Sequence, residues 1–315
     1  MPQIIPGKPS MHLPLLQKAL GGDHKALARC ISMLENEAEG YEELLESLPD
    51  SAVPVTGITG PPGAGKSTIT DALISLFTED HKKVAVLCID PSSPFHSGAL
   101  LGDRIRMSRW FDTPTVFIRS LAGKNSLGGL SPKVIEITDL LKAAVFDHII
   151  IETIGVGQNE IEISGLADNT VVVLVPEGGD EVQTMKAGLM EIADIFVVNK
   201  ADRPGADIYM KNLRGMLAPA FSAKLSEIPV LKTNAVKGEG IAELYEAITQ
   251  REGMHSPEDK ARLFAQKAHL LIAKERMKDI DVSLLQEEIY AMLLKKDFNL
   301  YRYLKKFKAV AGRNE

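Results

Sequence analysis

Residues 60–67 read GPPGAGKS and match the phosphate-binding pattern G-x-x-x-x-G-K-[ST]. In that pattern the glycines let consecutive backbone N–H groups turn toward phosphate oxygens at the positive end of a helix. An apolar, β-branched run (55–59) precedes the pattern and a helical stretch (68–77) follows it, as the motif requires. We expect Lys66 to reach the β- and γ-phosphates of a nucleotide and Ser67 to bind Mg²⁺. The residues assigned to the nucleotide here are Gly60, Pro61, Pro62, Gly63, Ala64, Gly65, Lys66, Ser67 and Thr68.

The base of the nucleotide is indicated by a second pattern, N-K-x-D, which begins at Asn199 and includes Lys200. Its aspartate, Asp202, can accept hydrogen bonds from both N1–H and the 2-amino group of guanine, whereas adenine offers no such pair of donors. The segment formed by Thr233, Asn234 and Ala235, at the end of the next apolar run, is expected to offer backbone N–H to guanine O6. The sequence therefore predicts GTP and GDP as ligands.

Acidic residues at strand ends beside the phosphate loop are expected to serve the metal. Glu152 ends an apolar run and is expected to hold Mg²⁺ through water. Asp90 closes another run and is assigned to a metal-bound or nucleophilic water; the alternative is an aspartate that caps a Pro-Ser turn. Asp103, near two arginines, is a further candidate metal acid, and Asp180 is expected at the same crevice.

The glycine-rich stretch after Glu152 is expected to respond to the γ-phosphate. Gly155 would offer a backbone N–H to that phosphate, so the segment would change shape when the phosphate leaves. Gln158 either orients the attacking water or caps a loop, and both interpretations stay open. The residues assigned to catalysis are Lys66, Asp90, Glu152 and Gln158.

Seven short β-rich runs must position these side chains. They read as continuous apolar segments, which is typical of strands covered on both faces, and helical stretches lie between them. The pattern predicts an α/β fold, a P-loop NTPase with a mostly parallel central sheet flanked by helices. The carboxyl ends of its strands would share one crevice. The runs are 55–59, 84–90, 115–119, 148–153, 170–175, 195–199 and 230–233.

Helical patterns lie at both ends of the chain. Apolar residues recur at helical spacing over 23–48, and two apolar stripes after Ser256 predict two or three further helices. The basic residues of the tail indicate either a solvated helix face or a docking surface for an acidic partner or a neighbouring subunit. We expect an N-terminal helical extension at 1–50, a G domain at 51–252 and a C-terminal helical arm at 253–315.

Composition excludes several classes of protein. The 315 residues carry a net charge of −6, which argues against a general nucleic-acid binder. Two cysteines, Cys30 and Cys88, cannot form a disulfide framework or a four-thiolate zinc site. No apolar run approaches the ~18 residues of a membrane span. Prolines interrupt the first residues, so no secretory signal is expected and the predicted location is cytoplasmic.

The motifs, in this order, resemble those of the MeaB/ArgK family of P-loop GTPases, which includes the methylmalonic aciduria type A protein. The resemblance begins in the first predicted helix with KALARCIS (25–32) and extends to the C-terminal helices. Its most specific pieces are DPSS (90–93), GDRIRM (102–107), ETIGVGQ (152–158) and GDE (179–181).

This resemblance implies a GTP-hydrolysing chaperone that gates cofactor loading and protects or reactivates an adenosylcobalamin-dependent acyl-CoA mutase. It also implies a homodimer formed through the C-terminal helices, with an adenosyltransferase as a further candidate partner. The mutase would act on methylmalonyl-CoA or a related acyl-CoA. By position Asp90, Asp103 and Glu152 correspond to the metal-site acids, whereas Asp180, Glu181 and Lys186 fall in the loop called switch III.

Three other functions are weighed against this one. A metal-delivery GTPase would carry clusters of Cys or His, but the seven histidines here are scattered. An ArgK-like kinase or ATPase would need an acceptor site and a preference for ATP, which Asp202 disfavours. A non-hydrolysing adaptor would show no turnover.

Overall fold

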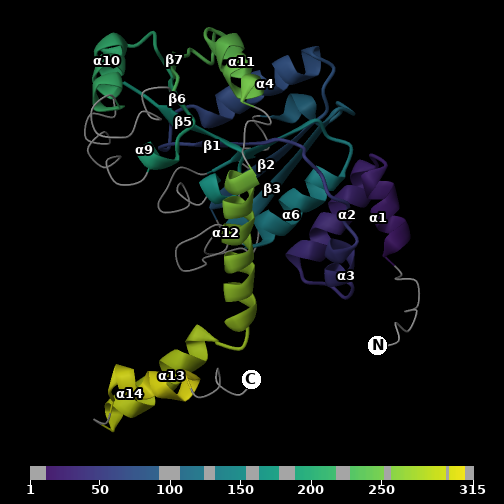
Figure 1. Ribbon diagram of the computed structural model, residues 1–315, viewed down its shortest axis with the longest axis vertical. Helices are drawn as coiled ribbons and strands as arrows, with labels where there is room; N and C mark the ends of the chain where they lie inside the picture. Colours follow the sequence, from purple (N-terminus) through teal and green to yellow (C-terminus); the bar gives the residue numbers. More distant parts are fainter. Residues whose placement is uncertain are drawn as a thin grey trace. The chain divides into compact units, whose positions relative to one another are not determined.

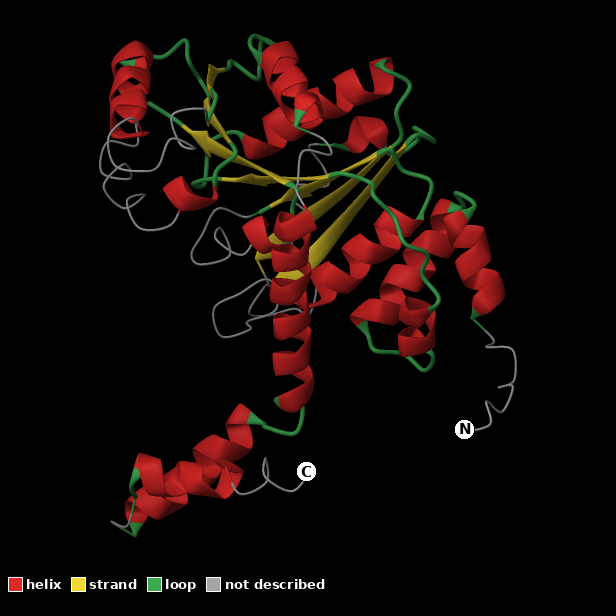
Figure 2. Cartoon of the chain, in the orientation of Figure 1, coloured by secondary structure: helices red, strands yellow, loops and turns green. Residues whose placement is uncertain are grey.

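Seven apolar segments form one sheet in the computed structural model, which describes residues 12–91, 107–123, 132–153, 163–176, 189–217, 228–251, 257–295 and 298–308. The order is β3-β2-β4-β1-β5-β6-β7, with every pair parallel (Figures 1 and 2). Each predicted run is a strand, and the predicted fold class is confirmed. The strands are β1 (Val55–Thr59), β2 (Val84–Pro91), β3 (Val116–Gly123), β4 (His148–Glu152), β5 (Asn169–Leu174), β6 (Ile195–Val198) and β7 (Val230–Lys232).

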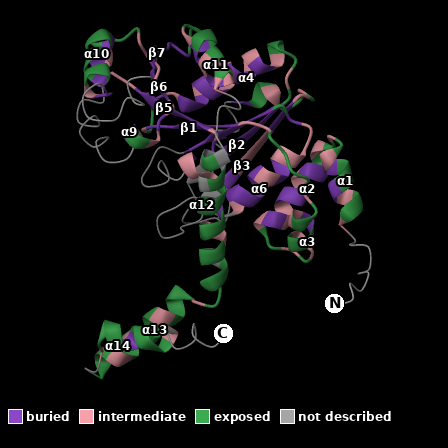
Figure 3. Ribbon diagram, in the orientation of Figure 1, coloured by how far each residue is buried: buried purple, intermediate pink, exposed green. Residues whose placement is uncertain are grey.

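Both faces of the sheet are covered, which explains why the strands read as unbroken apolar runs. Val171 and Val173 point into one core cluster with helices α4 (Lys66–Glu79) and α11 (Ile241–Gln250). Val172 and Leu174 point into a second cluster with α9 (Leu189–Ile192) and α10 (Ala206–Leu217). Helix α6 (Pro132–Ala143) contacts β4. Strands β1, β4, β5 and β6 are buried at every residue (Figure 3).

The N-terminal helical pattern is divided in a way that the periodicity did not predict. Residues 24–46 form two helices, α2 (His24–Glu35) and α3 (Tyr41–Glu46), because Glu37 (φ 47°) and Gly40 (φ 84°) adopt left-handed conformations that end a right-handed helix. A further helix, α1 (Leu13–Leu20), precedes them. Pro14 lies in its first turn, where a backbone N–H has no helical partner.

The chain divides into two compact units, Met1–Lys267 and Ala268–Glu315. Among the described residues after 256 there are three helices, namely α12 (Pro257–Arg276), α13 (Val282–Leu294) and α14 (Leu300–Lys308). In the second unit Glu288 accepts hydrogen bonds from Tyr303 and Lys306, which join α13 to α14. Among the described residues no helix is both long enough and apolar enough to cross a membrane. The expected boundary at 252/253 stays a prediction.

Candidate functional site

The phosphate loop lies between β1 and α4, and two of its glycines are required by close backbone approach. Gly60 has a φ of 136°, and a Cβ there would lie 2.0 Å from the carbonyl oxygen of Val173 on β5. Gly65 has a φ of 93°, and a Cβ there would lie 2.3 Å from Nδ2 of Asn199. The loop therefore packs directly against the ends of two neighbouring strands, which no larger residue would permit.

Lys66 begins helix α4 and directs its ammonium back into the loop. Its side chain is buried, and Nζ donates hydrogen bonds to the carbonyl oxygens of Gly60 (2.8 Å) and Pro61 (3.0 Å). The cation is thus held within the curve of the loop, beside the N-terminus of a helix. A positive charge at this place suits phosphate oxygens, as the motif predicted.

A buried carboxylate lies beside the start of α4. Glu152, the last residue of β4, accepts a hydrogen bond from Ser67 Oγ at its Oε1 (2.5 Å) and from Thr70 Oγ1 at its Oε2 (2.9 Å). All three residues are buried. The sequence predicts that Ser67 and Glu152 bind the same metal, but it assigns no role to Thr70. Thr70 could have been recognised because it lies three residues after Ser67, a spacing that places both hydroxyls on the same side of the helix.

The oxygens of Ser67 and Glu152 suit Mg²⁺, which prefers hydroxyl, carboxylate and water ligands. Within the described ranges, no three His, Cys, Asp or Glu residues gather as a metal-binding group. Both cysteines are buried, and burial raises the pKa of the Cys30 thiol to about 11, which disfavours the thiolate that a soft metal would need. Several residues expected in the site are not among those that the structure describes, namely Asp103, Gly155, Gln158, Asp180, Glu181 and Lys186. The side chain of Asp90 is also not described.

Asn199, which follows β6, joins the base-reading segment to the phosphate loop. Its Nδ2 donates to the carbonyl oxygen of Ala64 (2.8 Å), and its Oδ1 accepts from Thr233 Oγ1 (3.0 Å) and from the backbone N–H of Ala235 (3.2 Å). The sequence places Thr233 in the segment expected to approach guanine O6, but its hydrogen bond to Asn199 was not predicted. The two segments expected to read guanine are therefore bound to each other and to the loop by one buried amide.

The remaining base-reading residues lie beside Asn199 at the same edge of the sheet. Lys200 adopts a left-handed conformation (φ 56°), which turns the chain sharply after β6, and Asp202 is exposed beyond that turn. Asn234 is buried, and its backbone N–H donates to Glu239 O (2.9 Å). The roles assigned to these residues toward guanine stay predictions.

A glycine-rich loop between β1 and a helix, a lysine inside that loop and an acid at the end of a neighbouring parallel strand define a P-loop nucleoside triphosphatase. An N-K-x-D segment bound to the same loop places a guanine-reading pattern beside it. The chain belongs to the family described as methylmalonyl Co-A mutase-associated GTPase MeaB, which it matches over residues 27–287. It is accordingly a GTPase that binds guanine nucleotides.

Individual relatives agree with this assignment. A Pyrococcus horikoshii protein, named as a candidate GTPase, is 41% identical over 299 residues, which are 91% of this chain and 94% of that one. A fused isobutyryl-CoA mutase of Geobacillus kaustophilus is 37% identical over 235 residues, which are 70% of this chain and 22% of that one. The crystal structure of an LAO/AO transport system kinase shares the fold, with a TM-score of 0.69 and 23% identity over 98% of this chain and 99% of that one.

Proposed function

We propose that this GTPase works in a Mg²⁺-dependent cycle that controls cofactor loading on an adenosylcobalamin-dependent acyl-CoA mutase and protects or reactivates that mutase. The observation that carries the proposal is the fused mutase of Geobacillus kaustophilus, in which a segment similar to most of this chain shares one polypeptide with a mutase. The family's description, which names methylmalonyl Co-A mutase, supports the same class of partner. Methylmalonyl-CoA and isobutyryl-CoA are therefore the substrates to test on the partner enzyme.

In this cycle the described side chains bind and orient the nucleotide. Lys66, already held inside the loop, neutralises phosphate charge, and Asp202 accepts from guanine N1–H and the 2-amino group. Ser67 and Glu152 would hold Mg²⁺ together with Asp90 and Asp103. Bound Mg²⁺ would supply charge neutralisation at the β- and γ-phosphates.

The proposal also assigns roles to residues that the structure does not describe, to the C-terminal helices and to a second partner. Gly155 and Gln158 respond to the γ-phosphate and the attacking water, while Asp180, Glu181 and Lys186 sense the partner. Helices α12 to α14 form the arm of a homodimer. Apolar side chains exposed on α13 and α14 support an arm that packs against another surface, among them Leu284, Leu293, Leu294 and Leu304. An adenosyltransferase is the candidate second partner.

Calorimetry with purified protein tests the nucleotide half of the proposal. We expect GTP and GDP to bind and ATP not to bind. Asp202→Asn should weaken GTP binding at least about 10-fold, because a hydrogen bond to a charged group contributes about 1.5–3 kcal/mol. Asp207→Asn is the matched control, since Asp207 is exposed on α10 and bound to Lys232 instead. Equal binding of ATP and GTP would contradict the guanine assignment. Lys66→Ala should abolish hydrolysis.

The partner half is tested by capture from the source cell, with the chain loaded with GDP or with a non-hydrolysable GTP analogue. Recovery of an acyl-CoA mutase subunit in one nucleotide state, identified by mass spectrometry, supports the proposal. The captured mutase should also accelerate GTP hydrolysis, with Lys66→Ala as the inactive control. Failure to recover a cobalamin mutase in either state would refute the chaperone role and leave the GTPase assignment intact.

A further inference from the structure

One buried amide at the base-reading edge of the sheet is left without a partner. Asn234 follows β7 and is buried, yet its Nδ2 contacts no hydrogen-bond acceptor among the described residues. Buried side-chain amides are nearly always hydrogen-bonded, because an unsatisfied donor costs free energy. The neighbouring amide of Asn199, by contrast, forms hydrogen bonds at both of its ends. The unpaired donor of Asn234 therefore points to a ligand.

The backbone of Asn234 is held in place, so the residue cannot shift to find a partner elsewhere in the protein. Its N–H donates to Glu239 O (2.9 Å), and its carbonyl oxygen accepts from the N–H groups of Lys237 (3.0 Å) and Glu239 (3.2 Å). Gly240 closes the same turn, since a Cβ there would lie 1.9 Å from the carbonyl oxygen of Lys232. The last torsion of an asparagine side chain is soft, so the amide itself can still rotate toward a ligand.

Every backbone N–H of the segment 233–235 already donates within the protein. Those of Thr233 and Asn234 donate to backbone carbonyl oxygens (2.9 Å in each case), and that of Ala235 donates to Oδ1 of Asn199 (3.2 Å). These are the N–H groups that the sequence assigned to guanine O6. The hydroxyl of Thr233 also donates to Asn199 Oδ1. The donor that remains in this segment is the side-chain amide of Asn234.

This amide starts beside the carboxylate that is assigned to guanine. The N–H of Ala201 donates to the carbonyl oxygen of Thr233 (3.0 Å), which joins the turn after β6 to the end of β7. Asp202 and Asn234 directly follow these two residues, so the Cα of each lies about 3.8 Å from the Cα of its bonded neighbour.

Guanine presents its 2-amino group, N1–H and O6 in a row along one edge, as two donors followed by an acceptor. A carboxylate that accepts from the two donors leaves O6 facing the adjacent part of the site. An acceptor that is buried there without a donor would weaken binding. The chemistry of the base therefore requires a donor next to Asp202, where the unpaired amide begins.

We propose that Asn234 is a specificity-determining residue of the nucleotide site, whose Nδ2 donates a hydrogen bond to O6 of the bound guanine. This inference rests on the assignment of guanine to Asp202 in the proposed function. The carboxylate accepts from the two donors of the base edge, and the amide donates to its acceptor. Loss of the amide thus weakens the binding of bases that carry an oxygen at position 6, and it does not destabilise the free protein.

Calorimetry with GDP, IDP and 6-thio-GDP tests the contact in wild type and Asn234→Ala. IDP keeps O6 and N1–H but lacks the 2-amino group, whereas 6-thio-GDP keeps both donors and carries sulfur, a weak acceptor, in place of O6. We expect Asn234→Ala to weaken GDP and IDP binding about 10-fold each, which corresponds to about 1.4 kcal/mol, the size of one net hydrogen bond. Binding of 6-thio-GDP should change less than about twofold, because its hydrogen bond to the amide is already weak.

Two further variants complete the comparison. Asn212→Ala is the matched control, because Asn212 is an exposed asparagine of α10, and it should bind all three nucleotides as wild type does. Asn234→Asp keeps the shape of the side chain but replaces the donor with an oxygen, so it should bind GDP at least as weakly as Asn234→Ala does. It also tests the proposal independently if the alanine variant does not fold.

Thermal unfolding without nucleotide gives a readout that separates binding from a structural role. Asn234→Ala removes an unpaired buried donor, so its melting temperature should equal or exceed that of wild type. Asn199→Ala removes an amide that is bonded at both ends, so its melting temperature should fall. The two buried asparagines of the same edge should therefore respond in opposite ways.

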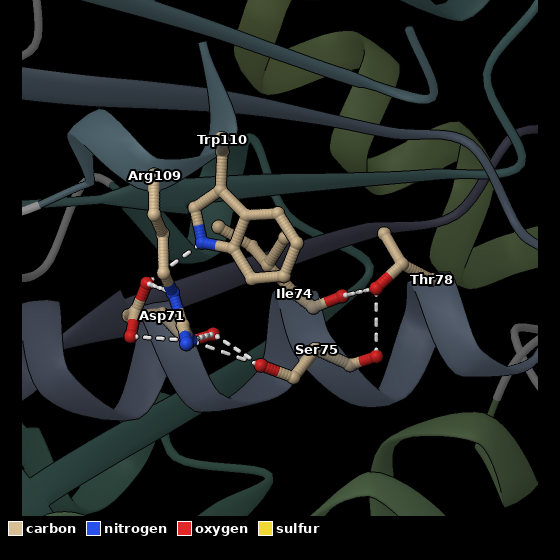
Figure 4. Close-up of polar contacts among 6 residues, drawn as sticks. All are labelled: Asp71, Ile74, Ser75, Thr78, Arg109 and Trp110. Carbon is tan, nitrogen blue, oxygen red and sulfur yellow. Dashed lines mark hydrogen bonds and ion pairs between the residues drawn. The ribbon is translucent and has the colours of Figure 1, made fainter. Parts of the chain in front are cut away.

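The fluorescence of Trp110, the one tryptophan of the chain, follows this transition. Trp110 ends the 3₁₀ turn η1 (Ser108–Trp110), which lies beside α4 (Figure 4). Its indole N–H donates to Asp71 Oδ1 (2.7 Å), and Arg109 donates to both oxygens of the same carboxylate (2.9 and 2.6 Å). Trp110 also packs against the core cluster that contains residues of α4 and the sheet, so its environment changes when this core unfolds.

Three results would overturn the contact to O6. They are unchanged GDP binding in Asn234→Ala, an equal loss of GDP and 6-thio-GDP binding, and a melting temperature lowered as far as in Asn199→Ala. A loss of GDP binding that spares IDP would also overturn it, since the amide would then act through Asp202. If wild type binds ADP as well as GDP, the guanine assignment itself fails, which is a different result from a wild type that prefers GDP and an unaffected Asn234→Ala.

Discussion

Truncation of Asn199 should destabilise the protein even when no nucleotide is bound. The residue is almost completely buried, and its amide connects three segments that are far apart in the sequence. Nδ2 binds the phosphate loop at Ala64 O, and Oδ1 binds Thr233 and the backbone of Ala235. Asn199→Ala removes all three hydrogen bonds and leaves their partners buried.

The magnitude follows from those contacts. Each hydrogen bond contributes about 1 kcal/mol net, and a buried partner that finds no substitute costs more. Ala64 is fully buried and Ala235 is nearly so, so water does not readily replace the lost amide. We expect Asn199→Ala to lower the free energy of unfolding by about 3 kcal/mol.

Two variants separate the contributions. Thr233→Val keeps the shape of the side chain and removes one hydrogen bond, so it should cost about 1 kcal/mol. Asn199→Asp keeps the Oδ1 acceptor but turns an oxygen toward Ala64 O in place of a donor. It should therefore destabilise the protein at least as much as the truncation does.

Equilibrium unfolding in guanidinium chloride, without nucleotide, measures these differences. Circular dichroism and fluorescence should report one transition for the first unit, and GDP affinity is measured in parallel. A loss below about 0.5 kcal/mol for Asn199→Ala would refute the reasoning, since surface substitutions fall within that range. A loss that appears only with GDP present would show that Asn199 acts on the ligand and not on the scaffold.

Three more predictions concern Glu152, His24 and Cys30. Glu152→Gln should keep the protein folded, since an amide oxygen still accepts from Ser67 or Thr70, but it should lower Mg²⁺-stimulated GTP hydrolysis about 100-fold. Steady-state phosphate release, measured against the Mg²⁺ concentration, checks this. An unchanged rate would contradict the metal role of Glu152. Burial lowers the pKa of His24 below 6.5, so the unfolded chain binds the extra proton and stability falls as the pH drops from 6.5 toward the folded pKa. His24→Phe should flatten that decline in urea titrations at pH 7 and pH 5, and an identical slope would exclude His24 as its source. Cys30, with its pKa raised to about 11, should not react with iodoacetamide at pH 8 until the protein unfolds. Mass spectrometry measures the labelling, and rapid labelling of Cys30 in the native protein would contradict its burial.

Much of the fold could be predicted because local sequence determines it. All seven strands lie where apolar runs predict them. Each begins within one residue of its expected position and ends within one residue of it, except β3, which ends four residues later. The agreement arises because a strand covered on both faces has few polar positions to interrupt its pattern. The phosphate loop could be predicted for a similar reason. Gly60 and Gly65 have backbone conformations and close contacts that allow no other residue. The glycines of the motif therefore indicate the backbone conformation of the loop directly.

The parts that escaped prediction depend on long-range contacts or single backbone torsions. The break between α2 and α3 comes from Glu37 and Gly40, and one non-glycine residue at positive φ leaves no periodic signal. Asp71 and Arg109 are 38 residues apart, and each by itself reads as an ordinary surface charge. Thr70 looked like any polar residue of a helix until β4 placed Glu152 beside it. The pairing of these side chains follows from the sheet order, which motifs do not encode.

Helix α4 emerges as the element that links the parts of the site. Its first residue fills the phosphate loop, its first turn holds Glu152 at the end of β4, and its second turn holds η1 through Asp71 and Ser75. Asn199 adds a fourth connection, from the end of β6 to the loop that precedes the helix. With this many fixed contacts, α4 cannot shift without breaking several hydrogen bonds at once. Substitutions that remove these hydrogen bonds, such as Asn199→Ala, should therefore loosen the attachment of α4 to the sheet and lower the free energy of unfolding.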